Sequence, residues 1–502
     1  MLINPSFIAP KTAGFGLSFP LGLGYLGAAL KRAGHEVIGL DAAAQRSPTE
    51  IADGFIRYGL NQTELSQRIK EIQPDIVGIS CFFSSRFPAV LETAKTIKST
   101  NSGIKIIVGG AHPSIMPEQI CSHAEIDYAM IGEAEESLVE FIDALEKRQD
   151  FSSIDGLAFR RNGQVIVNPK THYIDNLDSL GFPDWSLLDF ERYLTLNEDR
   201  WGLGHGRYAP VITSRSCPYR CNFCSVQKVM GQKYRARSAE HVLGEIEILV
   251  DRYGVNELSF EDDNLTFDKN RFIQICEGMI GYKFGIRWNT PNGVHVGSLD
   301  SEMIELARAA GCDSLNLAIE SGDEHMRNHV IKKRLKTEKI YEVTRACRNA
   351  GIKVNAYFVI GMPGESEQSI NNTKRLIKDL HFNNLSIFVA TPIPGTRLYD
   401  ECLENGYIKP GQFDNEFISN QAIIFTQPAI VTPQFDGQKV NLWRHRLFNA
   451  YYVSSLRNGL FYWLKENPRA FVSMLAKVIL YAICGEQLSF RLTEKIRDLI
   501  KK

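Results

Sequence analysis

Short apolar runs alternate with amphipathic stretches through the first 148 residues. Runs suited to buried strands occur at 2–4, 36–40, 75–80, 105–108 and 128–131. Between them, apolar residues recur at helical spacing, as in 21–30, 63–72, 89–97 and 137–146. Short strands separated by helices are typical of a parallel sheet covered on both faces. The pattern therefore predicts an α/β, doubly wound, Rossmann-like domain over residues 1–148.

A second alternation, with a longer period, runs from residue 209 to residue 402. Runs suited to strands occur at 209–214, 257–260, 285–289, 314–319, 354–360 and 385–390. Helical patterns lie between them at 239–253, from 269, and at 301–310, 337–350 and 366–380. Six βα-like units predict a partial (β/α)6 barrel, with its chemistry at the carboxyl ends of the strands.

Two regions fall outside this alternation. Residues 149–208 form a connector, in which two β-prone runs flank Asn162-Gly163, a strong hairpin signal. Residues 403–502 are mainly helical in pattern, with an aromatic and arginine-rich stretch at 440–452, then Pro468 and an apolar run at 471–484. We expect these helices to cap the barrel. The alternatives are a lid over a large hydrophobic substrate or peripheral contact with a membrane surface.

Composition narrows the class of protein. Of 502 residues, 44% are hydrophobic and 23% are charged, which is ordinary for a globular chain of two or three domains. The formal net charge of -1 provides no basic field, so we expect no nucleic-acid partner. We expect no signal peptide, because the N-terminus lacks a basic region, and no membrane-spanning run. Ten irregularly placed cysteines suit a reducing compartment, so the expected location is cytoplasmic.

Three cysteines are closely spaced directly after the first strand of the predicted barrel. Cys217, Cys221 and Cys224 have the spacing Cys-x3-Cys-x2-Cys, and the next cysteine is Cys276. A structural zinc site or a plain electron-transfer cluster uses four protein ligands. Three cysteines on a four-iron cluster leave one iron open to a substrate or cofactor. The plainer alternative is three reduced thiols on a loop.

Polar residues and glycines follow the later strands of the predicted barrel. The candidate ligand-binding residues among them are Asp262, Asp263, Asn289, Glu320, Ser321, Gly361 and Thr391. Because strand ends meet at one edge, we expect these residues to face the cysteine loop. Carboxylates suit an ammonium group and ribose hydroxyls, and glycine-rich backbone suits the edge of an adenine. The pattern predicts one site for a ligand with these groups.

The strand ends of the first domain carry a similar set. Its candidate cofactor-binding residues are Ser80, Gly109, Gly110, His112, Gly132 and Glu133. Ligands of doubly wound sheets bind beyond the carboxyl ends of the strands, and glycines there allow close approach of the backbone. Tight turns and helix starts are an equally good explanation of these residues.

The cysteine motif, with Phe223 before its last cysteine, resembles the signature of the radical S-adenosylmethionine (SAM) superfamily. The resemblance implies that the three cysteines hold a [4Fe-4S] cluster and that SAM binds the open iron. It places Asp262 and Asp263 at the methionine amino group, Glu320 and Ser321 at the ribose and carboxylate, and 361–365 beside the adenine. Phe223 would pack near the adenine, with core packing as the alternative.

The first domain resembles the cobalamin-binding domain that precedes the barrel in one branch of this superfamily. The matching stretches are 20–26, which begins with Pro20, then 108–113 and 131–135. The Asp-x-His-x-x-Gly motif that supplies a histidine to cobalt is absent. The resemblance therefore implies binding without a histidine ligand, and His112 is not proposed to bind cobalt. The alternative is a degenerate domain without cobalamin.

The implied activity is reductive cleavage of SAM to a 5'-deoxyadenosyl radical, most simply for methylation of an unactivated carbon. Oxidative cyclisation or ring rearrangement, with both cofactors but without methyl transfer, is the alternative. The C-terminal region resembles that of proteins related to the anaerobic magnesium-protoporphyrin monomethyl ester cyclase, a resemblance that does not fix the substrate. A methylthiotransferase fits less well, because the first domain has no second cysteine triad. A non-catalytic iron-sulfur or zinc protein is the alternative outside enzymes. One expected partner is a small-molecule substrate, either hydrophobic or of a large natural-product type. The other is an electron donor such as flavodoxin or ferredoxin.

Overall fold

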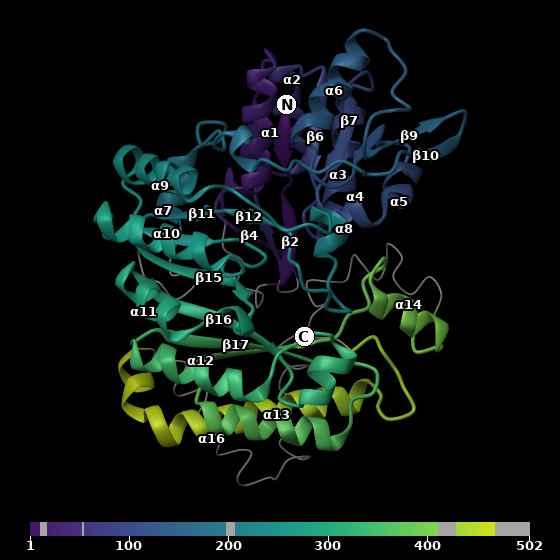
Figure 1. Ribbon diagram of the computed structural model, residues 1–502. Helices are drawn as coiled ribbons and strands as arrows, with labels where there is room; N and C mark the ends of the chain where they lie inside the picture. Colours follow the sequence, from purple (N-terminus) through teal and green to yellow (C-terminus); the bar gives the residue numbers. More distant parts are fainter. Residues whose placement is uncertain (11–17, 53–54, 197–205, 410–427, 467–502) are drawn as a thin grey trace.

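The computed structural model describes residues 1–10, 18–52, 55–196, 206–409 and 428–466. The molecule consists of two α/β halves (Figure 1). The N-terminal sheet, with β6 and β7, lies at the top of the view, and the barrel strands β15, β16 and β17 lie below it. Helix α8 (Val226–Met230) lies between the two halves, beside the N-terminal helix α4 (Ala111–Ile115). Their contact joins the cysteine region to the first sheet.

The described N-terminal residues form a seven-stranded sheet in the order β10-β9-β8-β7-β6-β1-β3. The first five strands along the chain in this sheet are parallel, which confirms the doubly wound fold. They are β1 (Leu2–Asn4), β3 (Gly39–Asp41), β6 (Ile76–Ser80), β7 (Lys105–Gly109) and β8 (Tyr128–Met130). The covering helices are α1 (Leu21–Arg32), α2 (Gln62–Ile72), α3 (Phe87–Thr100) and α6 (Glu135–Glu146).

Two features of this half differ from the predicted pattern or extend it. The expected hairpin is confirmed as β9 (Leu157–Arg161) and β10 (Gln164–Val167), and β9 pairs antiparallel with β8, so the connector extends the first sheet. A separate three-stranded antiparallel sheet was not predicted. It consists of β2 (Phe7–Pro10), β4 (Thr49–Ala52) and β5 (Phe55–Tyr58). Its strands are short and mix polar with apolar residues, so the pattern carried no clear period.

The described part of the second half forms a parallel sheet in the order β11-β14-β15-β16-β17-β18, which confirms the partial barrel. The strands are β11 (Tyr208–Val211), β14 (Glu257–Phe260), β15 (Arg287–Val294), β16 (Cys312–Glu320), β17 (Lys353–Ile360) and β18 (Asn384–Val389). The helices after them are α9 (Ala239–Tyr253), α10 (Lys269–Gly281), α11 (Ser301–Ala309), α12 (Thr337–Asn349) and α13 (Glu367–Leu380). Caps set their bounds, as where Ser238 begins α9 and left-handed Gly254 ends it.

Strand β15 is longer than the sequence predicted. The pattern placed residues 290–293 in a loop after the strand, but Thr290 pairs with Leu315 and Val294 pairs with Leu317 across a register shift. The extra residues form an irregular bulge that the strand absorbs. Pro291 and Gly293 had suggested a turn, and both are tolerated at a bulge.

The connector contacts both halves, and the C-terminal helix covers the barrel half. Trp185 packs against Phe19 at a ring-centroid distance of 4.8 Å, and Phe182 packs against His241 of α9 at 4.6 Å. Helix α16 (Gly437–Glu466) packs against α13 and β18, and Trp443 donates a hydrogen bond to Glu367 at 2.8 Å. The described helix is therefore the expected cap. The predicted helix at 471–484 lies outside the described residues.

None of the helices in the described ranges has the length and apolar character that crossing a membrane requires.

Candidate active site

The cysteine loop begins and ends on a small hairpin. Strands β12 (Ser214–Arg215) and β13 (Arg235–Ala236) pair antiparallel at its base. Ser216 leaves the hairpin with φ of 69°, a left-handed conformation that costs energy for a residue with a side chain. Its hydroxyl donates to the carbonyl of Gly231 at 2.6 Å and its N–H donates to Asp263 at 3.2 Å. These two hydrogen bonds therefore fix the first residue of the loop in place.

The barrel holds the rest of the loop through backbone contacts and one aromatic stack. The N–H of Asn222 donates to the carbonyl of Ile331 at 3.1 Å, and the carbonyl of Asn222 accepts from Leu398 at 3.0 Å. Tyr219 stacks on His295 with ring centroids 3.6 Å apart. Burial, with a smaller effect of a nearby lysine, lowers the pKa of His295 to about 3, so its ring is neutral. The loop thus has contacts with three segments that follow barrel strands.

The three cysteines lie on this loop with different exposure: Cys217 and Cys221 are half-buried and Cys224 is exposed. Burial raises the pKa of Cys221 to about 11, so metal binding there must displace a proton. The buried carboxamide of Asn222 has no hydrogen-bond partner among the described residues, which fits a polar occupant beside the loop. Within the described ranges, no three His, Cys, Asp or Glu side chains are gathered around a single metal-ion position.

The two carboxylates after β14 have different surroundings. Asp262 is buried and accepts from Thr213 Oγ1 at 2.7 Å and from the hydroxyl of Ser214, so it fastens β12. Burial raises the pKa of Asp263 to about 7, and neighbouring Asp262 adds to this shift. Among the described residues, Asp263 accepts a hydrogen bond only from the N–H of Ser216. Its remaining carboxylate capacity fits a cationic ligand group better than that of Asp262.

Glu320 forms a buried ion pair after β16. Its Oε1 lies 2.8 Å from Nζ of Lys333, and both side chains are 8% exposed. Burial acts to lower the pKa of Lys333, but Glu320 and nearby Cys221 raise it, so the lysine stays charged. Glu320 has φ of 68°, and Ser321 accepts from the N–H of Asp323 at 3.2 Å. A cation therefore lies beside the cysteine loop, next to the carboxylate predicted to contact the ribose.

The turn after β17 is organised by a buried carboxyl group. Gly361 has φ of 82°, and its N–H donates to Glu365, as does the N–H of Met362 at 3.3 Å. Burial raises the pKa of Glu365 from its ordinary 4.5 to about 8. Glu365 is therefore protonated at neutral pH and shapes the turn predicted to lie beside the adenine.

We expect Glu365→Gln to remove a pH dependence of stability. Between pH 4.5 and about pH 8 the folded carboxyl keeps its proton while the unfolded one loses it, so wild-type stability falls as pH rises through this window. Glutamine can accept the same hydrogen bonds without titrating. The difference in melting temperature between wild type and Glu365→Gln should grow in favour of the variant from pH 5 to pH 8. A constant difference across this range would contradict an elevated pKa.

One of the remaining predicted SAM residues, Asn289, does not lie at a strand end as predicted, because β15 continues to Val294. Asn289 is buried in β15 and accepts from the hydroxyl of Ser259 at 2.6 Å. Thr391 is buried directly after β18. Phe223 is half-buried and packs against the barrel core, which leaves both of its predicted roles open. Apart from Asn289, the strand-end candidates lie at the carboxyl ends of β14, β16, β17 and β18, and their contacts with SAM stay a prediction.

The predicted cofactor residues of the first domain also lie along one edge. Pro20 begins α1, Ser80 and Gly109 are register partners at the ends of β6 and β7, and Gly110 follows. A Cβ on Gly110, which has φ of 118°, would lie 2.7 Å from the carbonyl oxygen of Cys81, so this glycine is required by the turn itself. His112 is fully buried, and burial lowers its pKa to about 4. That His112 does not bind cobalt stays a prediction.

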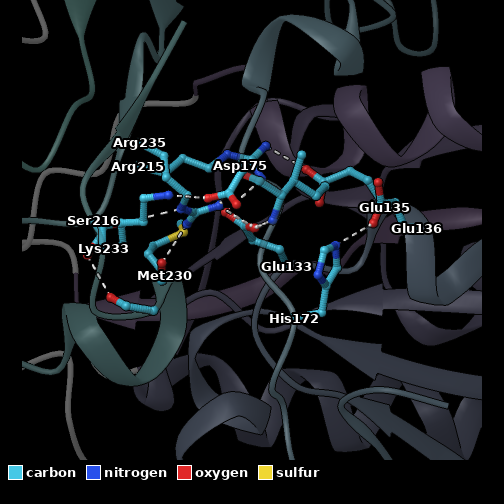
Figure 2. A network of polar contacts seen from close by, with 12 residues as sticks. Glu133, Glu135, Glu136, His172, Asp175, Arg215, Ser216, Met230, Lys233 and Arg235 are labelled. Carbon is cyan, nitrogen blue, oxygen red and sulfur yellow. Dashed lines mark hydrogen bonds and ion pairs between the residues drawn. The ribbon is translucent and has the colours of Figure 1, made fainter. Parts of the chain in front are cut away.

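Gly132 and Glu133 lie where the first domain touches the cysteine region. A Cβ on Gly132 would lie 3.1 Å from the carbonyl oxygen of Val229 in α8. Glu133 is buried and its carboxylate lies 2.7 Å from Arg235 and 3.1 Å from Arg215, which come from the hairpin below the cysteine loop (Figure 2). The structure therefore gives Glu133 partners in the barrel half, and a cobalamin contact for it stays a prediction.

Sequence reasoning missed four residues around the loop: Arg215, Arg235, His295 and Lys333. The arginines flank the cysteine motif, but no periodicity links them to carboxylates about 100 positions earlier. Lys333 lies in a run of basic residues, 332–334, which is typical of a solvated surface. A cationic residue close to a metal-binding loop was the only available signal, and it is weak.

Two family models match the chain. The model described as B12 binding domain matches residues 15–142, and the model described as Radical SAM superfamily matches residues 211–377. Together they cover more than half of the chain. Their order and positions agree with the two sheets of the structure.

Curated relatives match over most of their length. The chain is 29% identical to the cytidylyl-2-hydroxyethylphosphonate methyltransferase of Streptomyces wedmorensis over 473 residues, which cover 88% of this chain and 87% of the relative. It is 26% identical to the anaerobic magnesium-protoporphyrin IX monomethyl ester cyclase of Rubrivivax gelatinosus, over 80% of this chain and 69% of that relative. Methyltransferases and a cyclase are therefore both among its relatives.

A solved structure shares the fold. The radical SAM methyltransferase TsrM of Kitasatospora setae, solved with cobalamin and a [4Fe-4S] cluster bound, superposes with a TM-score of 0.69 at 16% identity, over 95% of this chain and 98% of that one. The likeness confirms the fold, a Rossmann-like domain followed by a partial barrel. The two family models show that the chain belongs to the radical SAM superfamily and carries a B12 binding domain before the barrel.

Proposed function

We propose that this enzyme methylates an unactivated carbon of a small molecule and uses a [4Fe-4S] cluster, SAM and cobalamin. One observation carries the proposal. Helix α4, which follows the glycine turn of β7, packs against α8, which follows the last cysteine. The expected corrinoid edge of the first sheet and the cysteine loop therefore adjoin each other, as transfer of a methyl group to a nearby carbon requires.

The residues present fit these cofactors. When bound, the cluster and SAM supply a 5'-deoxyadenosyl radical that removes a hydrogen atom from carbon, and cobalamin supplies the methyl group. Cys217, Cys221 and Cys224 would hold the cluster. Asp263 has carboxylate capacity for the ammonium of SAM, and Glu320 lies where the ribose is expected.

Methyl transfer is favoured over other radical reactions by the extent of the match to the phosphonate methyltransferase, which covers nearly the whole of both chains. We also propose that the enzyme is cytoplasmic and receives electrons from a low-potential electron donor, flavodoxin or ferredoxin. The second candidate function is oxidative cyclisation or ring rearrangement without net methyl transfer. It is favoured by the match to the anaerobic cyclase over 80% of this chain.

The test uses anaerobically reconstituted enzyme, SAM labelled in its methyl group, reduced flavodoxin, and a small-molecule extract from cells that lack the gene. We expect a new labelled product, with 5'-deoxyadenosine and S-adenosylhomocysteine formed in equal amounts. Formation of 5'-deoxyadenosine with an unlabelled product would contradict methylation and support the cyclase function. A protein that binds about one zinc per chain and never cleaves SAM would contradict the radical enzyme altogether.

A further inference from the structure

Four buried charged residues join the two halves below the cysteine loop. Glu133 lies between β8 and α6, Glu135 is the first residue of α6, and Arg215 and Arg235 lie on β12 and β13. The carboxylates and the guanidinium groups point toward one another (Figure 2). Glu133 lies 2.7 Å from Arg235 and 3.1 Å from Arg215, and Glu135 lies 2.6 Å from Arg215. No side chain among the four is more than 8% exposed. We call these residues the interdomain cluster.

The hairpin depends on the carboxylates of the first domain. Strands β12 and β13 have two residues each, and Arg215 and Arg235 are direct partners across the hairpin. Like charges directly opposite each other destabilise a strand pair, and so short a hairpin has few backbone hydrogen bonds to offset this. Glu133 forms ion pairs with both guanidinium groups, and Glu133 and Glu135 together balance their two positive charges. The position of the hairpin is therefore set by the segment that carries Glu133 and Glu135.

The position of the hairpin in turn sets the start of the cysteine loop. Arg215 directly precedes Ser216, whose hydroxyl is bonded to Gly231 and whose N–H is bonded to Asp263. Arg235 also donates to the carbonyl of Met230 at 2.6 Å, at the end of α8. A shift of either arginine is thus passed to both ends of the loop that carries the cysteines.

The same carboxylate segment is tied to the expected corrinoid edge. Gly132 directly precedes Glu133, and its N–H donates to the hydroxyl of Ser114 at 2.8 Å. That hydroxyl donates to the carbonyl of Gly110 at 2.7 Å. The turns after β7 and β8 are therefore linked by hydrogen bonds, and the second turn continues into the interdomain cluster.

We propose that the interdomain cluster couples the two cofactor sites, so that binding of a corrinoid and binding of SAM strengthen each other. The inference rests on the proposed function, which places a corrinoid at Gly110 and Gly132 and SAM at the cysteine loop. Each ligand orders turns that are connected through the cluster, so the second ligand finds them already ordered. By linkage, each ligand changes the affinity of the other by the same factor.

The test measures affinity rather than turnover. Wild-type protein that carries its [4Fe-4S] cluster is titrated anaerobically with hydroxocobalamin in the absence of reductant. The titration is done with and without saturating SAM. We expect SAM to tighten hydroxocobalamin binding about tenfold, and hydroxocobalamin to tighten SAM binding by the same factor. In Glu135→Gln, which keeps the shape but removes one of the two negative charges at Arg215, the factor should fall below about twofold.

Two further variants make the test specific. Arg215→Lys keeps the charge, but one ammonium group cannot bridge two carboxylates as a guanidinium does, so we expect an intermediate factor. Asp175→Asn is the matched control. It removes an ion pair with Lys233 that is 2.7 Å long and more than 70% exposed in the same region (Figure 2), and it should keep the full factor.

Three results would overturn the coupling: independent binding of the two ligands in wild type, full coupling in Glu135→Gln, or an equal loss in Asp175→Asn. If circular dichroism shows that Glu135→Gln is unfolded, full coupling in Arg215→Lys would overturn the proposal instead. A wild-type protein that binds SAM but not hydroxocobalamin contradicts the proposed function, and the coupling with it. Binding of both without linkage contradicts the coupling alone.

Discussion

Cys221→Ala is expected to abolish SAM cleavage, with the rate of 5'-deoxyadenosine formation lowered at least about a thousandfold. Cys221 is one of three thiols available to a cluster on a single loop, and its removal leaves two. The expected corrinoid residues lie on the other sheet, so the variant should still bind hydroxocobalamin. Its affinity should fall by no more than the coupling factor, about tenfold. Iron and sulfide content, product formation and spectral titration measure these quantities.

The matched control is Cys276→Ala. Cys276 is buried on α10, away from the loop, so this variant should retain the cluster and SAM cleavage. SAM cleavage at the wild-type rate in Cys221→Ala would contradict the three-cysteine cluster. Complete loss of both the cluster and hydroxocobalamin binding would show that the two halves do not hold their cofactors separately.

Lys333→Met is expected to be the most destabilising single substitution near the site. It leaves Glu320 buried without its cationic partner, which costs about 3–5 kcal/mol. It also removes the positive charge beside the cysteine loop, so we expect weaker SAM binding as well. Melting temperature and anaerobic SAM titration measure the two effects.

Two comparisons separate the lost ion pair from a general loss of packing. Lys333→Met/Glu320→Gln removes both charges, so it should melt above Lys333→Met. Lys269→Met removes the exposed pairs with Asp300 and Glu302, and should lower the melting temperature far less than Lys333→Met does. A double variant that melts at or below the single variant would show that Glu320 does not suffer from losing its partner.

Much of the fold follows from local patterns in the sequence. Helices α9 and α12 begin close to the predicted residues. The signals that predict them, apolar residues at helical spacing and capping residues such as Ser238 and Gly254, act within a few positions. The cysteine loop was predicted for the same reason, since its three ligands lie within eight residues. The strand-end residues were brought together because parallel strands share an edge.

What the sequence did not predict depends on contacts between distant segments. Arg235 and Glu133 are 102 positions apart, and each has the appearance of a surface charge in its own segment. Asp262 was predicted to contact SAM, and its hydrogen bonds to Thr213 and Ser214 show that it also fastens the hairpin before the cysteines. Strand β15 continues through Pro291 because its neighbour accommodates a bulge, which no local signal reveals.

We propose above all that the cysteine loop and the edge of the first sheet enclose one reaction site. An anaerobic crystal structure of the enzyme with its cluster, SAM and hydroxocobalamin bound tests it most directly. We predict SAM on an iron that has no protein ligand, and corrinoid density between the turns at Gly110 and Gly132 and the loop of Cys217, Cys221 and Cys224. A fourth protein ligand on the cluster, or corrinoid bound away from this edge, would contradict the account.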